Sequence, residues 1–126
     1  NAFSGCESLT SVTIGDSVTG IGSYAFKNCS NLEKINLPES LTFIGESAFE
    51  NCTSLESIVI PAAVKKIGDN AFRNCSKLKN IQFEITDGWQ CFDVNTPMTD
   101  ILDLSNAEQN ATYLILKYNQ YTWKRA

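Results

Sequence analysis

The residues most capable of chemistry in this chain are its five cysteines. Cys6, Cys29, Cys52 and Cys75 recur at a constant spacing of 23 residues, whereas Cys91 lies outside that spacing. Zinc sites typically use Cys-x-x-Cys pairs, and the sequence contains none. Because a free cysteine packs as a small apolar side chain, we expect the repeated cysteines to form a buried column. Disulfides between equivalent cysteines and a metal site are the alternatives, since stacked strands hold Cα atoms within disulfide range.

Histidine is absent from the chain. The commonest general base and the commonest metal ligand are therefore missing, and Ser-His-Asp or Cys-His catalysis is impossible. Four acids near the C-terminal end are the remaining candidates for a cation site: Asp87, Asp93, Asp100 and Asp103. Carboxylates bind calcium, but the spacing of these acids fits no calcium-loop motif, and we expect them in solvated turns and caps. The sequence predicts a chain that is not an enzyme and that needs no cofactor or metal.

The charge of the chain argues against a nucleic-acid partner. Its net charge is -4 and its ten basic residues are scattered, whereas phosphate binding requires clustered lysines and arginines. The only adjacent basic pairs, Lys65-Lys66 and Lys124-Arg125, are predicted to lie on solvated faces. The longest unbroken apolar run, residues 113–116, is far shorter than the roughly 20 residues that span a bilayer. We therefore expect no nucleic acid and no direct insertion into a membrane.

The spacing of the cysteines extends to the whole sequence up to Phe83. Other columns keep the same period without a gap: Ala-Phe begins at 2, 25, 48 and 71, Leu stands at 9, 32, 55 and 78, Ile or Val at 12, 35, 58 and 81, and Gly at 22, 45 and 68. A unit of this size cannot bury its own apolar face, so equivalent units must stack and cover one another. The sequence therefore predicts a solenoid in which like side chains bury against like.

Each repeat carries the signals of short elements. Alternating apolar residues predict a main strand at 9–14, 32–37, 55–60 and 78–83, and a second extended stretch at 18–21, 41–44 and 64–67. The Ala-Phe-x-x-Cys-x-x-Leu segment has helical spacing and predicts a helical turn. Gly or Asn precedes each repeated Cys, which indicates a left-handed turn there. The glycine of each Ile-Gly pair indicates a second tight corner.

The motif decays after Phe83. We interpret 84–104 as a degenerate last coil, in which Met98, Ile101 and Leu104 fall in the Cys, Leu and Ile columns and Trp89 with Phe92 replaces the lost Phe. Residues 105–126 should form the cap that a terminal coil needs. The first coil has no such cover, and its open strand edge would invite pairing. We therefore expect the chain to be part of a longer repeat protein.

The cap is predicted to be a helix. Ser105 and Glu108 fit a capping box, and the apolar positions that follow form one helical stripe. A hairpin is the alternative, because 113–116 and 121–123 are rich in strand-forming residues. We expect the aromatic residues of this end to be the core of the cap: Trp89, Tyr113, Tyr118, Tyr121 and Trp123.

Residues 2–83 repeat one consensus, which is Ala-Phe-x-Asn-Cys-x-x-Leu-x-x-Ile-x-Leu-Pro-x-x-(Val/Leu)-x-x-Ile-Gly. This consensus resembles the BspA-like, or Treponema-type, leucine-rich repeat. It departs at Gly15, where the two later repeats have proline. The resemblance implies an α/β repeat solenoid: a right-handed leucine-rich-repeat coil with a stacked parallel sheet, short helical turns and a C-terminal capping segment. Proteins with such repeats are typically bacterial cell-surface or secreted proteins, with relatives in protozoan parasites. The resemblance thus implies adhesion to host or extracellular-matrix proteins, or contact between microbes.

The candidate binding face is the solvent side of the main strands. Stacking should place its side chains in rows on one broad surface: Ser11, Thr13, Lys34, Asn36, Ser57, Val59, Asn80 and Gln82. Extended surfaces of this kind suit protein partners, although this one lacks an aromatic anchor. We therefore expect a protein-interaction module. A passive spacer or stalk and an accessory module of a larger secreted enzyme are the alternatives.

Overall fold

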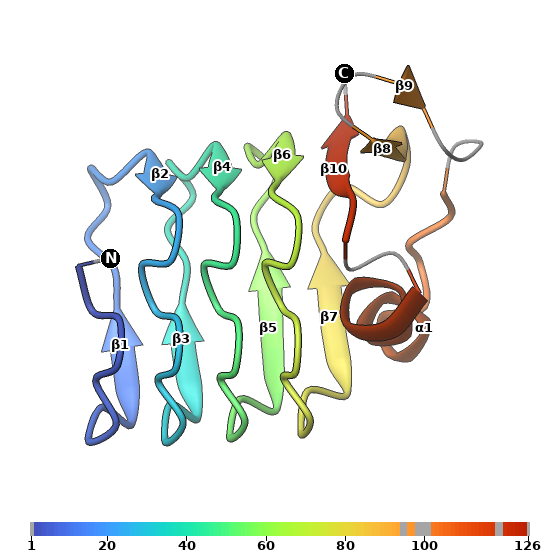
Figure 1. The fold of residues 1–126 in the computed structure, drawn as a ribbon. Helices are drawn as coiled ribbons and strands as arrows, with labels where there is room; N and C mark the ends of the chain where they lie inside the picture. The colour runs from blue at the N-terminus through green and yellow to red at the C-terminus, as the bar shows by residue number, and fades with distance from the viewer. Residues whose placement is uncertain (1, 94–95, 98–101, 118–119, 126) are drawn as a thin grey trace.

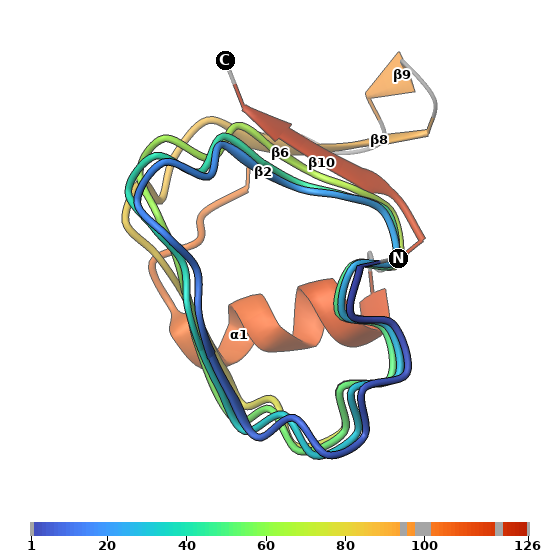
Figure 2. The ribbon, with the colours of Figure 1, turned by 90° about the vertical axis from the view of Figure 1, so that its left-hand side faces the viewer.

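The computed structural model describes residues 2–93, 96–97, 102–117 and 120–125. Its elements follow the chain in this order: β1 (Ser11–Thr13), β2 (Gly20–Ile21), β3 (Lys34–Asn36), β4 (Phe43–Ile44), β5 (Ser57–Ile60), β6 (Lys66–Ile67), β7 (Asn80–Phe83), β8 (Trp89–Asp93), β9 (Thr96–Pro97), α1 (Ala107–Thr112), the π-helix η1 (Tyr113–Lys117) and β10 (Thr122–Arg125). Strands β1, β3, β5 and β7 follow one another along one side of a stack of coils, and β2, β4 and β6 follow one another along another side (Figure 1). Seen along the stack, the outlines of the coils superpose, and α1 lies across its end (Figure 2).

The main strands lie inside the predicted ranges and are shorter. In β3, β5 and β7 the side chains alternate between exposed and buried, as expected for strands with one buried face. The pairing is parallel and follows the repeat, since Val12 lies opposite Ile35 and Ile58 lies opposite Ile81. The period of 23 residues read from the sequence is therefore confirmed in individual residue pairs.

A column of phenylalanine rings forms the centre of the core. The rings of Phe3, Phe26, Phe49 and Phe72 stack with centroids 5.3, 5.4 and 5.3 Å apart. Phe26, Phe49 and Phe72 are buried, whereas Phe3, at the end of the column, is 48% exposed. The expectation that each ring packs against its own equivalent is confirmed.

The predicted helical turn after each Ala-Phe pair is wrong. Residues 2–93 contain no helix, and this segment is a series of hydrogen-bonded turns, one of them closed by the Cys29 amide donating to the Phe26 carbonyl at 3.2 Å. Two residues in each complete coil have positive φ, which interrupts a right-handed helix: Tyr24 and Asn28, Ser47 and Asn51, and Asn70 and Asn74. The left-handed residue before each Cys was predicted. The one four residues earlier was not, because Tyr, Ser and Asn share no obvious signal there.

Close approach of neighbouring coils, and not positive φ, explains the glycine of the later Ile-Gly pairs. A Cβ atom on Gly45 would lie 2.6 Å from the backbone nitrogen of Ser23, and one on Gly68 would lie 2.4 Å from that of Glu46. Backbone atoms cannot move aside as a flexible side chain can. Only glycine therefore lets one coil pass the next at this corner.

Substitution of one of these glycines should disturb the stack. Gly68→Ala is expected to destabilise the fold by about 1–3 kcal/mol, the usual cost of overpacking. Gly22→Ala is the matched control, because nothing lies within 4 Å of a Cβ at Gly22. Urea titrations should give a lower midpoint for the Gly68 variant, and equal midpoints for the two variants would show that coil spacing does not explain the glycine.

Strand β10 extends the set formed by β2, β4 and β6. It pairs antiparallel with β6 on one side and with β8 on the other, and β8 pairs with β9. Within the described residues no strand pairs with the outer edge of β7, and α1 packs against β7 instead. The buried Asn110 of α1 donates from Nδ2 to the carbonyls of Ile81 and Leu104, at 2.8 and 2.7 Å. The helix thus supplies a donor to the last main strand.

The cap combines the two forms that the sequence left open. A helix is present, but its N-cap is Asn106 and not Ser105: the Asn106 Oδ1 accepts a bond from the Gln109 amide at 3.0 Å. The Ser105 amide donates to the Asp103 carboxylate at 3.0 Å and so belongs to the preceding turn. The strand-forming residues near the C-terminal end do form a strand, β10.

Two tryptophans form the core of the cap. Trp89 and Trp123 are fully buried and contact the Phe83 ring, with centroids 5.2 and 6.3 Å away. Tyr113 and Tyr121 are half-buried against the same core. Other residues assigned to this end lie outside the described residues: Met98, Asp100, Ile101 and Tyr118.

Candidate binding surface

The eight side chains predicted to form the binding face are all exposed on the main strands. Strand pairing sets them in rows: Ser11 lies opposite Lys34, Thr13 opposite Asn36, Ser57 opposite Asn80, and Val59 opposite Gln82. The residues between them in each strand point into the core. The structure therefore brings these residues together as two paired groups.

A groove separates the two groups. β3 and β5 are neighbours but are not paired, so the main strands form two separate two-stranded sheets. The groove between them has a volume of about 370 Å³ and is lined by residues that include Lys34, Asn36, Val59, Pro61 and Glu84. Val59 is 45% exposed and gives the groove an apolar contact point. This break was not predicted, because all repeats carry the same strand pattern.

Glu84 gives the groove a negative charge. Its carboxylate accepts a hydrogen bond from the Ala62 amide at 3.1 Å. The charge of Glu84 also raises the pKa of the neighbouring Glu39 carboxyl. Because two adjacent carboxylates repel each other, a cationic group of a partner would be favoured here. This pair could not be predicted, because the two acids are 45 residues apart in the sequence, at 39 and 84.

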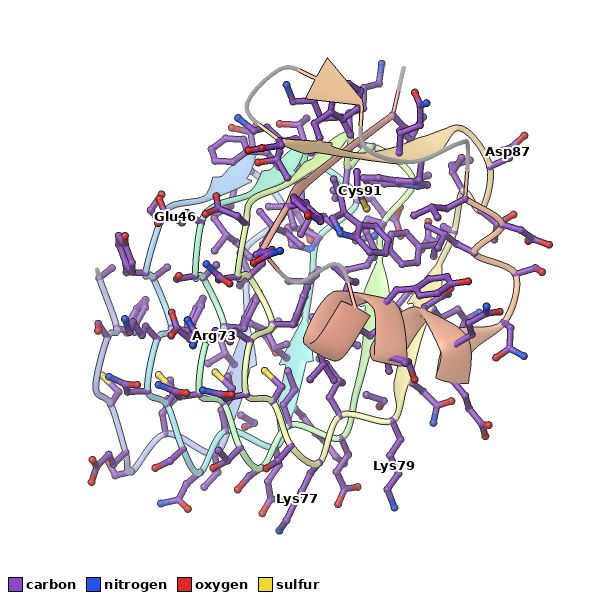
Figure 3. All side chains as sticks on the ribbon, turned by 45° about the vertical axis from the view of Figure 1, so that its right-hand side comes forward. Glu46, Arg73, Lys77, Lys79, Asp87 and Cys91 are labelled. Atoms are coloured by element: carbon purple, nitrogen blue, oxygen red, sulfur yellow. The ribbon has the colours of Figure 1, made fainter. Side chains whose placement is uncertain are left out.

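The cysteine column belongs to the core. All five cysteines are free thiols, and the disulfide alternative is therefore wrong. The Sγ atoms of Cys29, Cys52 and Cys75 donate to the phenylalanine carbonyl of the preceding coil, at 3.1, 3.2 and 3.0 Å. Sulfur atoms form a row across the coils in Figure 3, and Cys91 lies beneath β8 on the side of α1. A buried thiol that donates to a carbonyl is held in the protonated form, which is neither a nucleophile nor a metal ligand.

Burial of these thiols should make the fold less stable in alkali. Burial raises the pKa of Cys52 to about 12 and also raises the pKa of Cys29 and Cys75, whereas an exposed thiol has a pKa of about 8.5. Above that value the unfolded chain loses thiol protons that the folded chain retains, so the free energy of unfolding falls as the pH rises toward 12. Below it both states hold the protons, and the thiols have no effect on the pH dependence.

Urea titrations at pH 8 and about pH 10 test this dependence. Cys52→Ser is the matched variant, because serine keeps a hydroxyl donor and does not titrate in this range. The wild-type midpoint should fall more steeply with pH than that of the variant. Equal slopes would mean that the thiols titrate normally in the folded chain.

The other candidate sites have structural explanations. No group of three or more metal-ligating side chains is found in the described parts of the chain, and Asp103 binds the Ser105 amide. The sequence also contains four Asn-x-Ser/Thr motifs, the acceptor sequence for N-glycosylation. Those that begin at Asn28, Asn51 and Asn74 come from the repeat, where Asn51 Nδ2 donates to Asn28 Oδ1 at 2.7 Å and Asn74 Nδ2 to Asn51 Oδ1 at 2.9 Å. The fourth sequon begins at Asn110, which is buried.

Residues 1–110 match the family described as BspA type leucine-rich repeat region, in six copies. The chain belongs to this family. The resemblance read from residues 2–83 is therefore confirmed, and the match continues past Phe83. No curated protein matches the BspA-type chain significantly.

Solved structures of leucine-rich-repeat proteins are similar to the BspA-type chain. A leucine-rich cell surface protein from Faecalibacterium prausnitzii A2-165 is 35% identical with a TM-score of 0.68, and the match covers 84% of this chain and 28% of that one. A leucine-rich repeat protein from Bacteroides ovatus is 35% identical with a TM-score of 0.51, over 64% of this chain and 27% of that one. A leucine-rich repeat protein of T. pallidum is also 35% identical, with a TM-score of 0.49, over 64% of this chain and 48% of that one. The family match and the first two of these structures show that the BspA-type chain has the leucine-rich-repeat fold. It spans less than half the length of each of the three proteins.

Within the described part of the chain, no helix combines the length and hydropathy of a transmembrane segment.

Proposed function

We propose that the chain is a protein-interaction module of a bacterial cell-surface or secreted protein, and that its partner binds on the main strands. The observation that carries this proposal is the break between β3 and β5, which places a groove of about 370 Å³ in the middle of the predicted face. A partner side chain can enter a groove, whereas an unbroken polar sheet offers only a flat surface. The cell-surface description of the Faecalibacterium prausnitzii protein and the known family roles support adhesion to host or extracellular-matrix proteins.

The chemistry of the groove favours a partner with a basic and an apolar side chain close together. Val59 supplies exposed apolar surface, and Glu39 with Glu84 supplies two neighbouring carboxylates. Lys34 and Asn36 supply donors on the opposite wall. In this proposal residues 1–83 carry the surface, 84–104 form a degenerate last repeat, and 105–126 cap it.

Binding to a panel of immobilised host and matrix proteins tests the proposal. We expect saturable binding by the chain, and at least a tenfold loss, about 1.4 kcal/mol, in Val59→Asp and when Lys34, Asn36, Asn80 and Gln82 are changed together to Ser. Arg73→Ala is the control, because Arg73 is exposed on a turn outside the main strands and does not line the groove. Binding that survives the Val59 and fourfold variants would place the partner elsewhere.

Two other functions predict different results. A spacer or stalk would bind no partner and tolerate every surface change on the main strands. An accessory module of a secreted enzyme would occur in one polypeptide with a catalytic domain. The sequence of the complete gene decides between these two.

A further inference from the structure

A second groove lies between the last coil and the helical segment formed by α1 and η1. Its volume is about 600 Å³, and it shares no described residue with the groove between β3 and β5. One wall is the turn that precedes β7, and the other is one stripe of the helical segment. The lining residues are Cys75, Ser76, Leu78 and Lys79 on the turn, and Glu108, Ala111, Thr112 and Ile115 on the helical segment. Lys79 lies below the helix in Figure 3.

The floor of this second groove is apolar. Leu78 and Ala111 are buried, and Ile115 is half-buried against the core. Leu78 comes from the coil, whereas Ala111 and Ile115 come from the helical segment. An apolar side chain of a ligand would therefore be covered from two sides.

The backbone of the last coil has a free donor beside the second groove. The amides of Gly5, Asn28 and Asn51 each donate at 2.8 Å to a carbonyl of the next coil. Asn74 is the equivalent residue of the last coil and is exposed, and among the described residues its amide has no such acceptor. The second groove thus continues the interface through which the coils stack.

Side chains and carbonyls of this turn also await the bonds of a next coil. Asn74 Nδ2 donates to Asn51 Oδ1 at 2.9 Å, but no described residue donates to the Asn74 Oδ1. In an inner coil the Ser30 carbonyl accepts a bond from the Ser54 hydroxyl at 2.7 Å. Ser76 is the last equivalent of Ser30, and no described donor reaches its carbonyl. The last coil therefore offers one donor and two acceptors in the arrangement that binds a coil.

The charge of the turn favours acidic groups at the two ends of a ligand. Between 73 and 79 the turn has three exposed basic residues and no acid. These are Arg73, Lys77 and Lys79, and none of them has a salt bridge within the described parts of the chain. Glu108 on the helical wall is the opposing charge. Arg73 and Lys79 lie at the two ends of the turn, so an acid opposite each would be attracted.

From these contacts we infer that the second groove binds an extended segment of a partner protein with the pattern Glu-Asn-x-x-Ser-Leu-Glu. The carbonyl before the Asn accepts from the Asn74 amide, and the Asn side chain donates to the Asn74 Oδ1. The Ser hydroxyl donates to the Ser76 carbonyl, and the Leu packs on Leu78. Bonds to the main chain supply affinity and the apolar site supplies specificity, as when a peptide adds to a sheet edge.

A separate segment fits the second groove better than a second copy of the chain does. α1 lies across the end of the stack and packs against β7, where a complete coil would have to pair (Figure 2). The inner coils of another copy are covered by their neighbours. Its exposed first coil has Gly5 where the pattern requires Asn.

Fluorescence anisotropy with a labelled peptide tests the inference on the complete 126-residue chain. The probe has the sequence of residues 50–56, which fits the pattern, with Ser in place of Cys52 to prevent oxidation. One control peptide carries Asn51→Ala, another carries Leu55→Ser, and a third has the probe's composition in scrambled order. The probe should bind saturably, and each control peptide should bind at least tenfold more weakly.

Variants of the chain connect the binding to the second groove. Thr112→Glu places a long acidic side chain in the groove from an exposed position, and should weaken probe binding at least tenfold. Gln109→Glu is the matched control, because it adds the same charge to α1 at an exposed residue that does not line the groove. Asn74→Gly removes the Oδ1 acceptor, and glycine keeps the positive φ of this position. It should also weaken binding, and thermal unfolding confirms that each variant is folded.

Four results would overturn the inference. They are no saturable binding of the probe at millimolar concentration, equally tight binding of the scrambled peptide, and unchanged binding in folded Thr112→Glu. The fourth is self-association of the chain that Thr112→Glu abolishes, without binding of the probe, which would identify a second copy as the occupant. Val59→Asp, a variant for the main-strand proposal, should leave probe binding unchanged, so either proposal can fail while the other holds.

Discussion

Phe49→Ala should lower the free energy of unfolding by about 3–5 kcal/mol, the range for truncation of a buried phenylalanine. Its ring is fully buried and stacks on Phe26 and Phe72, at centroid distances of 5.4 and 5.3 Å. Alanine would leave a cavity in the middle of the column, and the surrounding coils cannot collapse into it because their spacing is set by strand pairing. A urea titration measures the loss.

The chain contains a matched control for this variant. Phe3 occupies the same position in its coil but stacks on Phe26 alone and is 48% exposed, so Phe3→Ala should cost clearly less. A loss below about 1 kcal/mol for Phe49→Ala, the size of an ordinary surface change, would mean that the ring column is not core.

Trp123→Ala should have a comparable effect, again about 3–5 kcal/mol, and should act on the cap. Trp123 is fully buried and its ring lies 6.3 Å from the Phe83 ring and 6.5 Å from the Tyr113 ring. It also lies on β10, the strand that joins β6 to β8. Loss of the side chain therefore removes packing between the last coil and the cap.

Hydrogen exchange locates this effect. Amides of β8 and β10 should lose protection before those of β3 and β5, because coils away from the cap keep their neighbours. Trp123→Phe should lose less than Trp123→Ala, since a ring remains against Phe83. Uniform loss of protection along the chain, or a loss below about 1 kcal/mol, would contradict the role assigned to Trp123.

The repeated part of the fold was predictable because equivalent residues of stacked coils pack against one another. Each column of apolar residues had a buried equivalent above or below, and the strand positions and the left-handed residue before each Cys followed directly. The turn after each Ala-Phe pair was misread, because helical spacing does not reveal the positive φ of Tyr24, Ser47 and Asn70.

The cap and the groove were less predictable for a physical reason. β10 pairs antiparallel with strands from distant parts of the chain, and such pairings leave no period in the sequence. The N-cap is Asn106 and not the predicted Ser105, because the Ser105 amide donates to the Asp103 carboxylate within the preceding turn. Proline alone does not explain the break between β3 and β5. Pro61 lacks the backbone N–H that the equivalent residue Glu84 donates to the Ile60 carbonyl. Pro38 also lacks this N–H, although β1 and β3 beside it are paired.

The candidate binding residues were also predictable only in part. Exposure of the eight main-strand residues followed from alternation, whereas their separation into two groups and the position of Glu84 beside Glu39 did not.

The adjacent basic pairs were expected on solvated faces. This is correct for Lys65 and Lys66, which are exposed, and wrong for Lys124 and Arg125, which are half-buried; the Arg125 guanidinium donates to the carbonyls of Val64 and Ala62. The pairing of Lys66 with Lys124 across β6 and β10 is a product of the cap.

Solution NMR of the chain with labelled phenylalanine tests the stacking of coils most directly. Centroid distances of 5.3–5.4 Å predict through-space contacts between the ring protons of Phe3 and Phe26, Phe26 and Phe49, and Phe49 and Phe72. Stacked coils should give all three contacts and none between Phe3 and Phe72. Rings that contact only solvent or unrelated side chains would contradict it.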